Sequence, residues 1–95
     1  MAPAYRHLVQ MPDGTTEIAH RGVRVYTILG LKQAGDTPEM IADAYNLPLG
    51  AVYEALAYAA DHPEEMEAIR QAELAIQREI LTRIPEDLRR GIRIP

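Results

Sequence analysis

The fold of this chain is decided by the stretch TPEMIADAYNLPLG, residues 37–50. Thr37 can cap a helix with its hydroxyl, and Pro38 suits the first helical position, where its missing N–H costs nothing. Asn46 tolerates the left-handed conformation that often ends a helix. The stretch therefore predicts two helices separated by a three-residue break, with the second helix beginning at Leu49.

Apolar spacing predicts further helices on both sides of this pair. We expect helices over residues 27–34, 38–45, 49–61, 63–83 and 86–90, with breaks at Gly35, His62-Pro63 and Ile84-Pro85. In the second helix, the buried face is expected to hold Ile41, Ala44 and Tyr45. In the third helix, we expect buried Leu49, Val52, Leu56 and Ala59 or Ala60, and outward Ala51, Glu54, Ala55 and Tyr58. In the fourth helix, one side is expected to hold Met66, Ile69, Ala72, Ile76 and Ile80.

The amino-terminal segment predicts a β-hairpin. The turn sequence Pro12-Asp13-Gly14-Thr15 separates two short strands, 8–11 and 16–19, and each turn residue favours a tight reversal. The stretch Val23-Arg24-Val25 either adds a third strand or leads directly into helix. The predicted fold is thus mainly α, with a small N-terminal β-hairpin, a three-helix helix-turn-helix unit and a long C-terminal helix.

Composition excludes several classes of function. The 95 residues hold no Cys, and no Ser occurs in the sequence, which removes thiol and serine nucleophiles. His7, His20 and His62 lack the spacing of metal ligands, and no glycine-rich phosphate loop is present. We therefore expect no enzyme activity, no metal and no cofactor. No apolar run is long enough to span a membrane, which predicts a cytoplasmic protein.

The two central helices also fit the residue pattern of a helix-turn-helix. Small Ala42, turn-forming Asn46 and aliphatic Val52 follow one another at intervals of four and six residues. The alternative is that any compact three-helix fold needs a small residue, a turn and a core aliphatic residue.

Several short motifs in order resemble one known family. They are RGVRVYTIL (21–29), AGDTPEMIA (34–42), LPL (47–49) and VYEALAYAADHPE (52–64). Together they resemble the family of domains of unknown function numbered 433 over roughly residues 16–67. Members of that family are similar to VapB-type antitoxins, with a homeodomain-like helix-turn-helix, and are often encoded beside a PIN-like ribonuclease toxin. The resemblance thus implies an antitoxin-like protein with such a toxin as its partner.

Candidate DNA contacts are few because the third helix carries no Arg, Lys, Asn or Gln to read base edges. We expect backbone contacts from Arg21, Arg24 and Lys32, with Tyr58 touching a thymine methyl or a phosphate. The alternatives are that these charges are ordinary solvated side chains, and that the outward Ala and Tyr residues form a homodimer contact.

The C-terminal tail is both apolar and basic, although the net charge of the chain is −4. Such a segment suits folding on a partner with an acidic surface, and a PIN-like ribonuclease holds its metal with carboxylates. The candidate partner-binding residues are Arg83, Leu88, Arg89, Arg90, Ile92 and Arg93. The alternative is that the fourth helix packs on its own domain or on its copy in a homodimer.

These features divide the chain into residues 1–62, the hairpin and helix-turn-helix domain, and residues 63–95, the C-terminal helix and tail. We expect a dimeric antitoxin that binds operator DNA through the first part and neutralises a PIN-like ribonuclease through the second. The rival is a stand-alone, dimeric DNA-binding transcriptional regulator without a toxin partner.

Overall fold

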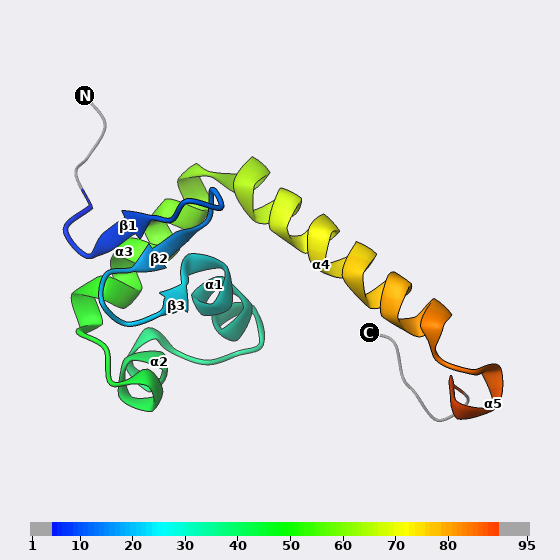
Figure 1. Cartoon of the computed structure of the whole chain (residues 1–95). Helices are drawn as coiled ribbons and strands as arrows, with labels where there is room; N and C mark the ends of the chain where they lie inside the picture. Colours follow the sequence, from blue (N-terminus) through cyan, green and yellow to red (C-terminus); the bar gives the residue numbers. More distant parts are fainter. Residues whose placement is uncertain (1–4, 90–95) are drawn as a thin grey trace.

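The computed structural model describes residues 5–89, apart from the side chains of Asp87 and Arg89. A small sheet and three helices form a rounded body, from which one long helix extends (Figure 1). The principal extents of 52 × 27 × 22 Å reflect this helix, because the body alone is much shorter in Figure 1.

The sheet has three antiparallel strands in the order β1-β2-β3. They are β1 Leu8–Gln10, β2 Thr16–Ile18 and β3 Val23–Arg24. The predicted hairpin is confirmed, with Leu8 opposite Ile18 and Gln10 opposite Thr16. In the turn, the Asp13 carboxylate accepts hydrogen bonds from the N–H and the hydroxyl of Thr15, which hold the pKa of Asp13 below its ordinary value. Gly14 takes a positive φ of 89°, which favours glycine there.

The helices follow the predicted bounds closely. They are α1 Val25–Gln33, α2 Pro38–Tyr45, α3 Leu49–Asp61, α4 Pro63–Arg83 and α5 Glu86–Arg89. The Thr37 hydroxyl accepts a hydrogen bond from the N–H of Met40, as expected of an N-cap, and Asn46 is left-handed at φ 53°. Helix α1 begins two residues earlier than predicted because β3 leads directly into it: Arg24 is still extended, and Val25 is already helical and fully buried.

The core lies where α1, α2 and α3 meet under β2. Its fully buried large side chains are Ile18, Val25, Ile28, Ile41 and Val52. The predicted burial of Leu49 is wrong, because this side chain is 41% exposed at the start of α3. In α2, Ala44 and Tyr45 are exposed, so Ile41 is the fully buried side chain of that helix, and the half-buried Ala42 packs beside it.

The predicted outward face of α3 is also largely wrong. Ala51, Ala55 and Tyr58 are buried, and only Glu54 of that set is partly exposed. Helix α3 packs on α1, α2, β1 and α4, so more than one face of the helix is in contact with other elements. The small side chains at Ala51 and Ala55 permit this close packing.

Tyr58 joins three parts of the molecule through its hydroxyl. The hydroxyl accepts a hydrogen bond from the buried Thr16 of β2 at 3.0 Å and donates one to Glu65 of α4 at 2.6 Å. The ring stacks on His62, with centroids 4.0 Å apart, and meets the edge of Tyr5. A side chain predicted to face solvent therefore links sheet, α3 and α4.

Glu54 of α3 holds the segment that precedes β1. Its carboxylate accepts hydrogen bonds from the N–H groups of Arg6 and His7 and pairs with the His7 ring. Burial raises the pKa of the Glu54 carboxyl, but these hydrogen bonds outweigh burial, so its pKa lies below the ordinary value. The ionised carboxylate thus stabilises the position of Arg6 and His7.

Tyr58→Phe should lower the free energy of unfolding by about 1–3 kcal/mol, because it leaves the buried Thr16 hydroxyl without its acceptor. Chemical denaturation measures this loss. Tyr53→Phe is the control, since its hydroxyl donates only to an exposed Glu39 carboxylate. Equal losses in the two variants would contradict the role assigned to Tyr58.

Glu54→Gln should cost about 1–2 kcal/mol at neutral pH, because the charge-assisted hydrogen bonds to the N-terminal segment weaken. The folded-state pKa of Glu54 is lowered, so its contribution is present above the ordinary pKa of 4.5 and is lost as the pH falls through the folded value. Urea denaturation at neutral pH and at about pH 3 should show that the difference in the free energy of unfolding between the wild type and Glu54→Gln is smaller in acid. A difference that is the same at both pH values would contradict this account.

Candidate functional site

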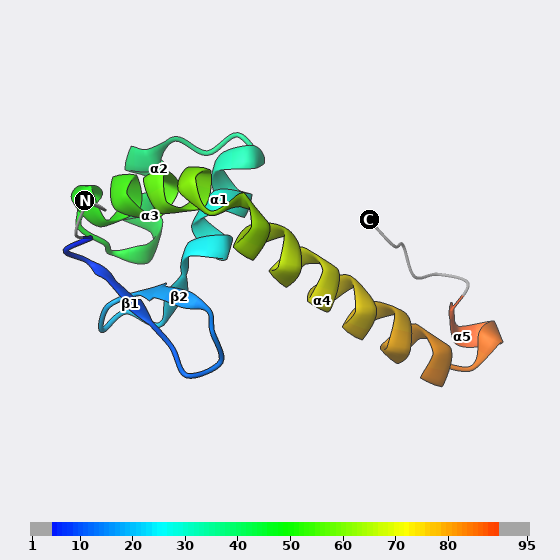
Figure 2. The same cartoon turned by 90° about the horizontal axis from the view of Figure 1, so that it is seen from above.

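Helix α4 carries an apolar surface that the rest of the domain does not cover. Only its first turns touch the body, where Met66 is buried and Ile69 packs against the core. Beyond them the helix leaves the body altogether (Figure 2). Ile76 is 56% exposed and Ile80 52% exposed, although both lie on the side of the helix that Ile69 begins.

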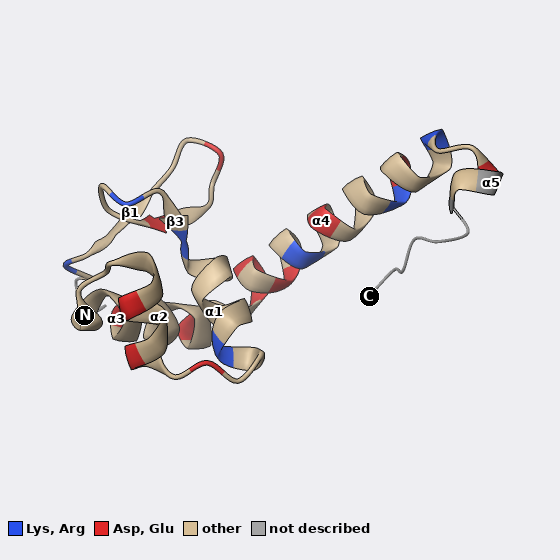
Figure 3. Ribbon diagram, turned by 90° about the horizontal axis from the view of Figure 1, so that it is seen from below, with Lys and Arg blue, Asp and Glu red and all other residues tan. Residues whose placement is uncertain are grey.

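Charged side chains of both signs alternate along α4 (Figure 3). Arg70 donates two hydrogen bonds to Glu67, and together with Gln71 this holds the pKa of Glu67 at about 2. Arg83 pairs with Glu79 one turn away. Two ion pairs thus form within the helix, and the exposed isoleucines are its unusual feature.

The predicted partner-binding residues fall partly within the described chain. Arg83 is exposed in the last turn of α4, and Leu88 is 64% exposed in α5. The backbone of Arg89 closes α5, but its side chain lies outside the described part, as do Arg90, Ile92 and Arg93. Leu81 and Ile84, between Ile80 and Leu88, are half-buried.

The four predicted DNA-contacting residues are not brought together. Arg24 forms an ion pair with Glu73 of α4 at 2.8 Å, and its guanidinium lies over the Tyr26 ring. Lys32 is exposed in the last turn of α1, eight residues further on, or about 12 Å along the helix. Tyr58 is only 6% exposed, so its predicted contact with DNA requires a surface position that it does not have.

Arg21 instead lies in a basic pocket that the sequence did not indicate. The pocket has a volume of about 320 Å³, and Arg6, His7 and His20 line it together with Arg21. The hairpin register places these residues together: the N–H of Ala19 donates to the carbonyl of His7, and continuing the pairing sets Arg6 opposite His20. Extending the predicted hairpin by two residues would have found this group.

Helices α2 and α3 and the break between them contain the three residues that the sequence pattern singled out, Ala42, Asn46 and Val52. Three residues join the helices, and the N–H of Leu47 donates to the carbonyl of Ala42 at 2.8 Å. Ala42 is half-buried and Val52 is fully buried between the helices. The exposed side chains of α3 include Leu49, Tyr53 and Ala57, none of which reads base edges through a bidentate hydrogen bond.

A groove of about 430 Å³ lies between α1, α3 and the start of α4, where Tyr26, Leu29, Leu56 and Met66 line it. Within residues 5–89, no three His, Asp or Glu side chains lie close enough to hold a metal ion. No helix in that range has the length and apolar character needed to cross a membrane.

Comparison with known proteins gives one match. A family model described as protein of unknown function, DUF433, matches residues 12–59, which span the hairpin turn, both later strands and helices α1 to α3 up to Ala59. No curated protein and no solved structure matches the chain. The match covers half of the chain and the whole core between β2 and α3. The chain therefore belongs to the DUF433 family.

Proposed function

We propose that this protein is a non-enzymatic, antitoxin-like partner protein, whose α4 and C-terminal tail bind and block a PIN-like ribonuclease toxin. The observation that carries the proposal is the exposure of Ile76 and Ile80 on a helix that leaves its own domain. Covering two such side chains is favourable, since burial of an aliphatic side chain contributes about 1.5–3 kcal/mol.

The charge of the tail adds to this support. The chain beyond Arg78 holds Arg83, Arg89, Arg90 and Arg93, against Glu79, Glu86 and Asp87. Arginine pairs with carboxylates in bidentate geometry, so a ribonuclease that holds its metal with acidic side chains is a partner of matching charge. An arginine of the tail would enter the acidic cleft while Ile76, Ile80 and Leu88 cover the surface beside it.

In this proposal the body, residues 5–62, dimerises and contacts operator DNA through α2 and α3. The short α2–α3 connection and the buried Val52 support a helix-turn-helix. DNA contact would come from positions other than Tyr58, which is buried, and Arg24, which is paired with Glu73.

Co-expression with the product of the adjacent gene, followed by purification through a tag on one chain, tests the proposal. The two proteins should elute together and the ribonuclease should be inactive. Ile76→Asp/Ile80→Asp should weaken the complex at least about a hundredfold, because each buried charge costs more than the 1.4 kcal/mol that equals a factor of ten.

The matched control is Ala75→Asp/Thr82→Asp, which adds the same charge to exposed positions at least about 100° away around α4. This control should bind as the wild type does, and circular dichroism should show both variants folded. If the wild-type chain and the ribonuclease elute separately and the ribonuclease is active, the proposal is wrong and a stand-alone regulator is favoured. The DNA affinity of such a regulator should be unchanged when residues 84–95 are removed.

A further inference from the structure

We propose that the pocket lined by Arg6, His7, His20 and Arg21 binds a backbone phosphate of duplex DNA. The inference rests on the DNA contact in the proposed function and assigns that contact to a different set of residues. Arg6 and Arg21 supply its charge, and the start of α3 forms its edge through Pro48.

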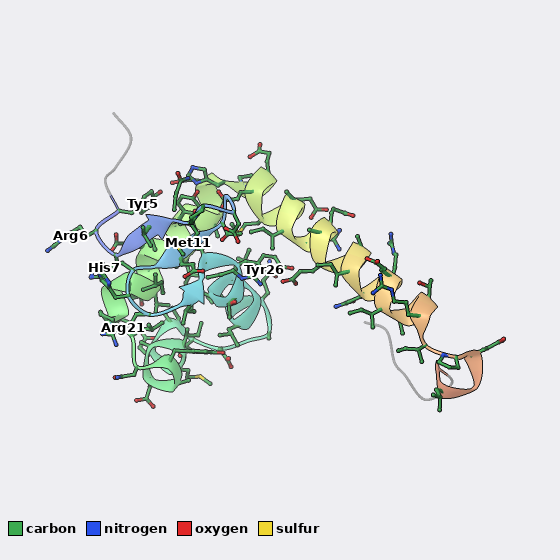
Figure 4. The ribbon with its side chains drawn as sticks, in the orientation of Figure 1. Tyr5, Arg6, His7, Met11, Arg21 and Tyr26 are labelled. Atoms are coloured by element: carbon green, nitrogen blue, oxygen red, sulfur yellow. The ribbon has the colours of Figure 1, made fainter. Side chains whose placement is uncertain are left out.

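Two independent contacts hold the pocket in shape. Ala19 donates its N–H to the His7 carbonyl at 2.7 Å, which ties the segment before β1 to the loop after β2. Glu54 binds the N–H groups of Arg6 and His7 from α3. Figure 4 shows Arg6, His7 and Arg21 along the same edge of the domain. The basic side chains thus come from an ordered backbone, which lowers the entropy lost on binding an anion.

The charge of the pocket is positive at neutral pH. Its described lining contains no Asp or Glu, and no ion pair within residues 5–89 involves Arg6 or Arg21. Glu54 lies outside this lining but close to it, because its carboxylate accepts hydrogen bonds from the N–H groups of Arg6 and His7. The two arginines therefore exceed the one nearby carboxylate. Helix α3 has no acidic side chain in its first turn. The lining thus offers an anion two arginine residues and no carboxylate.

A phosphate fits these groups better than a base edge does. The exposed part of α3 offers no bidentate reader of bases, whereas guanidinium groups bind phosphate oxygens in bidentate geometry. Such contacts position a protein on a duplex without selecting sequence. The net charge of −4 opposes DNA binding by most of the surface of the chain. We therefore expect contact with the DNA backbone at the pocket that holds two arginines.

Fluorescence anisotropy with a short mixed-sequence DNA duplex at low ionic strength tests the assignment in the full chain. Arg6→Gln/Arg21→Gln should weaken binding about tenfold or more and reduce the slope of log affinity against log salt by about 1.8 per protomer. Both side chains are exposed, so the variant should remain folded. The control Arg70→Gln/Arg78→Gln removes the same charge from exposed positions of α4 and should bind DNA as the wild type does.

Equal weakening in both variants would overturn the inference, because net charge alone would then explain binding. A wild-type chain with no DNA affinity would overturn it together with the DNA part of the proposed function, while leaving the ribonuclease test unaffected. Titration with inorganic phosphate, followed by NMR, is a second measurement. If the amide signals of His20 and Arg21 shift but the chain does not bind DNA, the pocket binds small anions only and the inference is wrong. Weaker ribonuclease binding in Arg6→Gln/Arg21→Gln, with DNA binding unchanged, would instead assign the pocket to an acidic protein surface.

Discussion

The hydroxyl of Tyr58 is the contact on which the arrangement of the molecule depends. It accepts a hydrogen bond from the buried Thr16 of β2 and donates one to Oε1 of Glu65 in α4, from a helix between them in the chain. A three-stranded sheet this small has little stability alone, and α4 has few contacts with the body. One side chain in the core therefore links the sheet to the start of α4. The stacked His62, which ends α3 and precedes α4, reinforces that link.

The proposed division of labour follows from how little core a chain of 95 residues can make. The buried side chains run from Thr16 to Met66, and every later side chain that the structure describes is half-buried or exposed. Helix α4 continues for 17 residues after Met66, from Glu67 to Arg83. Ile69 and Glu73 still contact the body, whereas Ile76 and Ile80 are exposed. A helix of low mean hydropathy with a few exposed isoleucines suits a partner that supplies the missing layer.

Local signals in the sequence predicted most of the fold. The Thr37-Pro38 cap, the Asn46 break and the Pro12–Thr15 turn each act within four residues, and the helices and strands they predict are present. The faces of the helices were predicted less well, because burial depends on neighbours distant in the sequence. Tyr58 accepts its hydrogen bond from Thr16, which lies 42 residues earlier, and helical periodicity cannot predict a contact at that separation.

The candidate sites show the same limit. Arg24 was expected to face DNA, but Glu73, 49 residues later, pairs with it. No site was predicted at Arg6 or His20, because these residues are distant in the sequence and line one pocket only when the hairpin is formed. The sequence also left open whether the fourth helix packs on its own domain, and the structure shows that its first turns do, whereas Ile76 and Ile80 are exposed.

The length of α4 has a steric consequence. The pocket with Arg6 and Arg21 lies at one end of a 52 Å molecule, and α5 lies at the other end (Figures 1 and 4). The proposed DNA contact and the exposed Ile80 and Leu88 therefore lie on separate parts of one subunit. Neither surface covers the other, so a single subunit presents both at the same time.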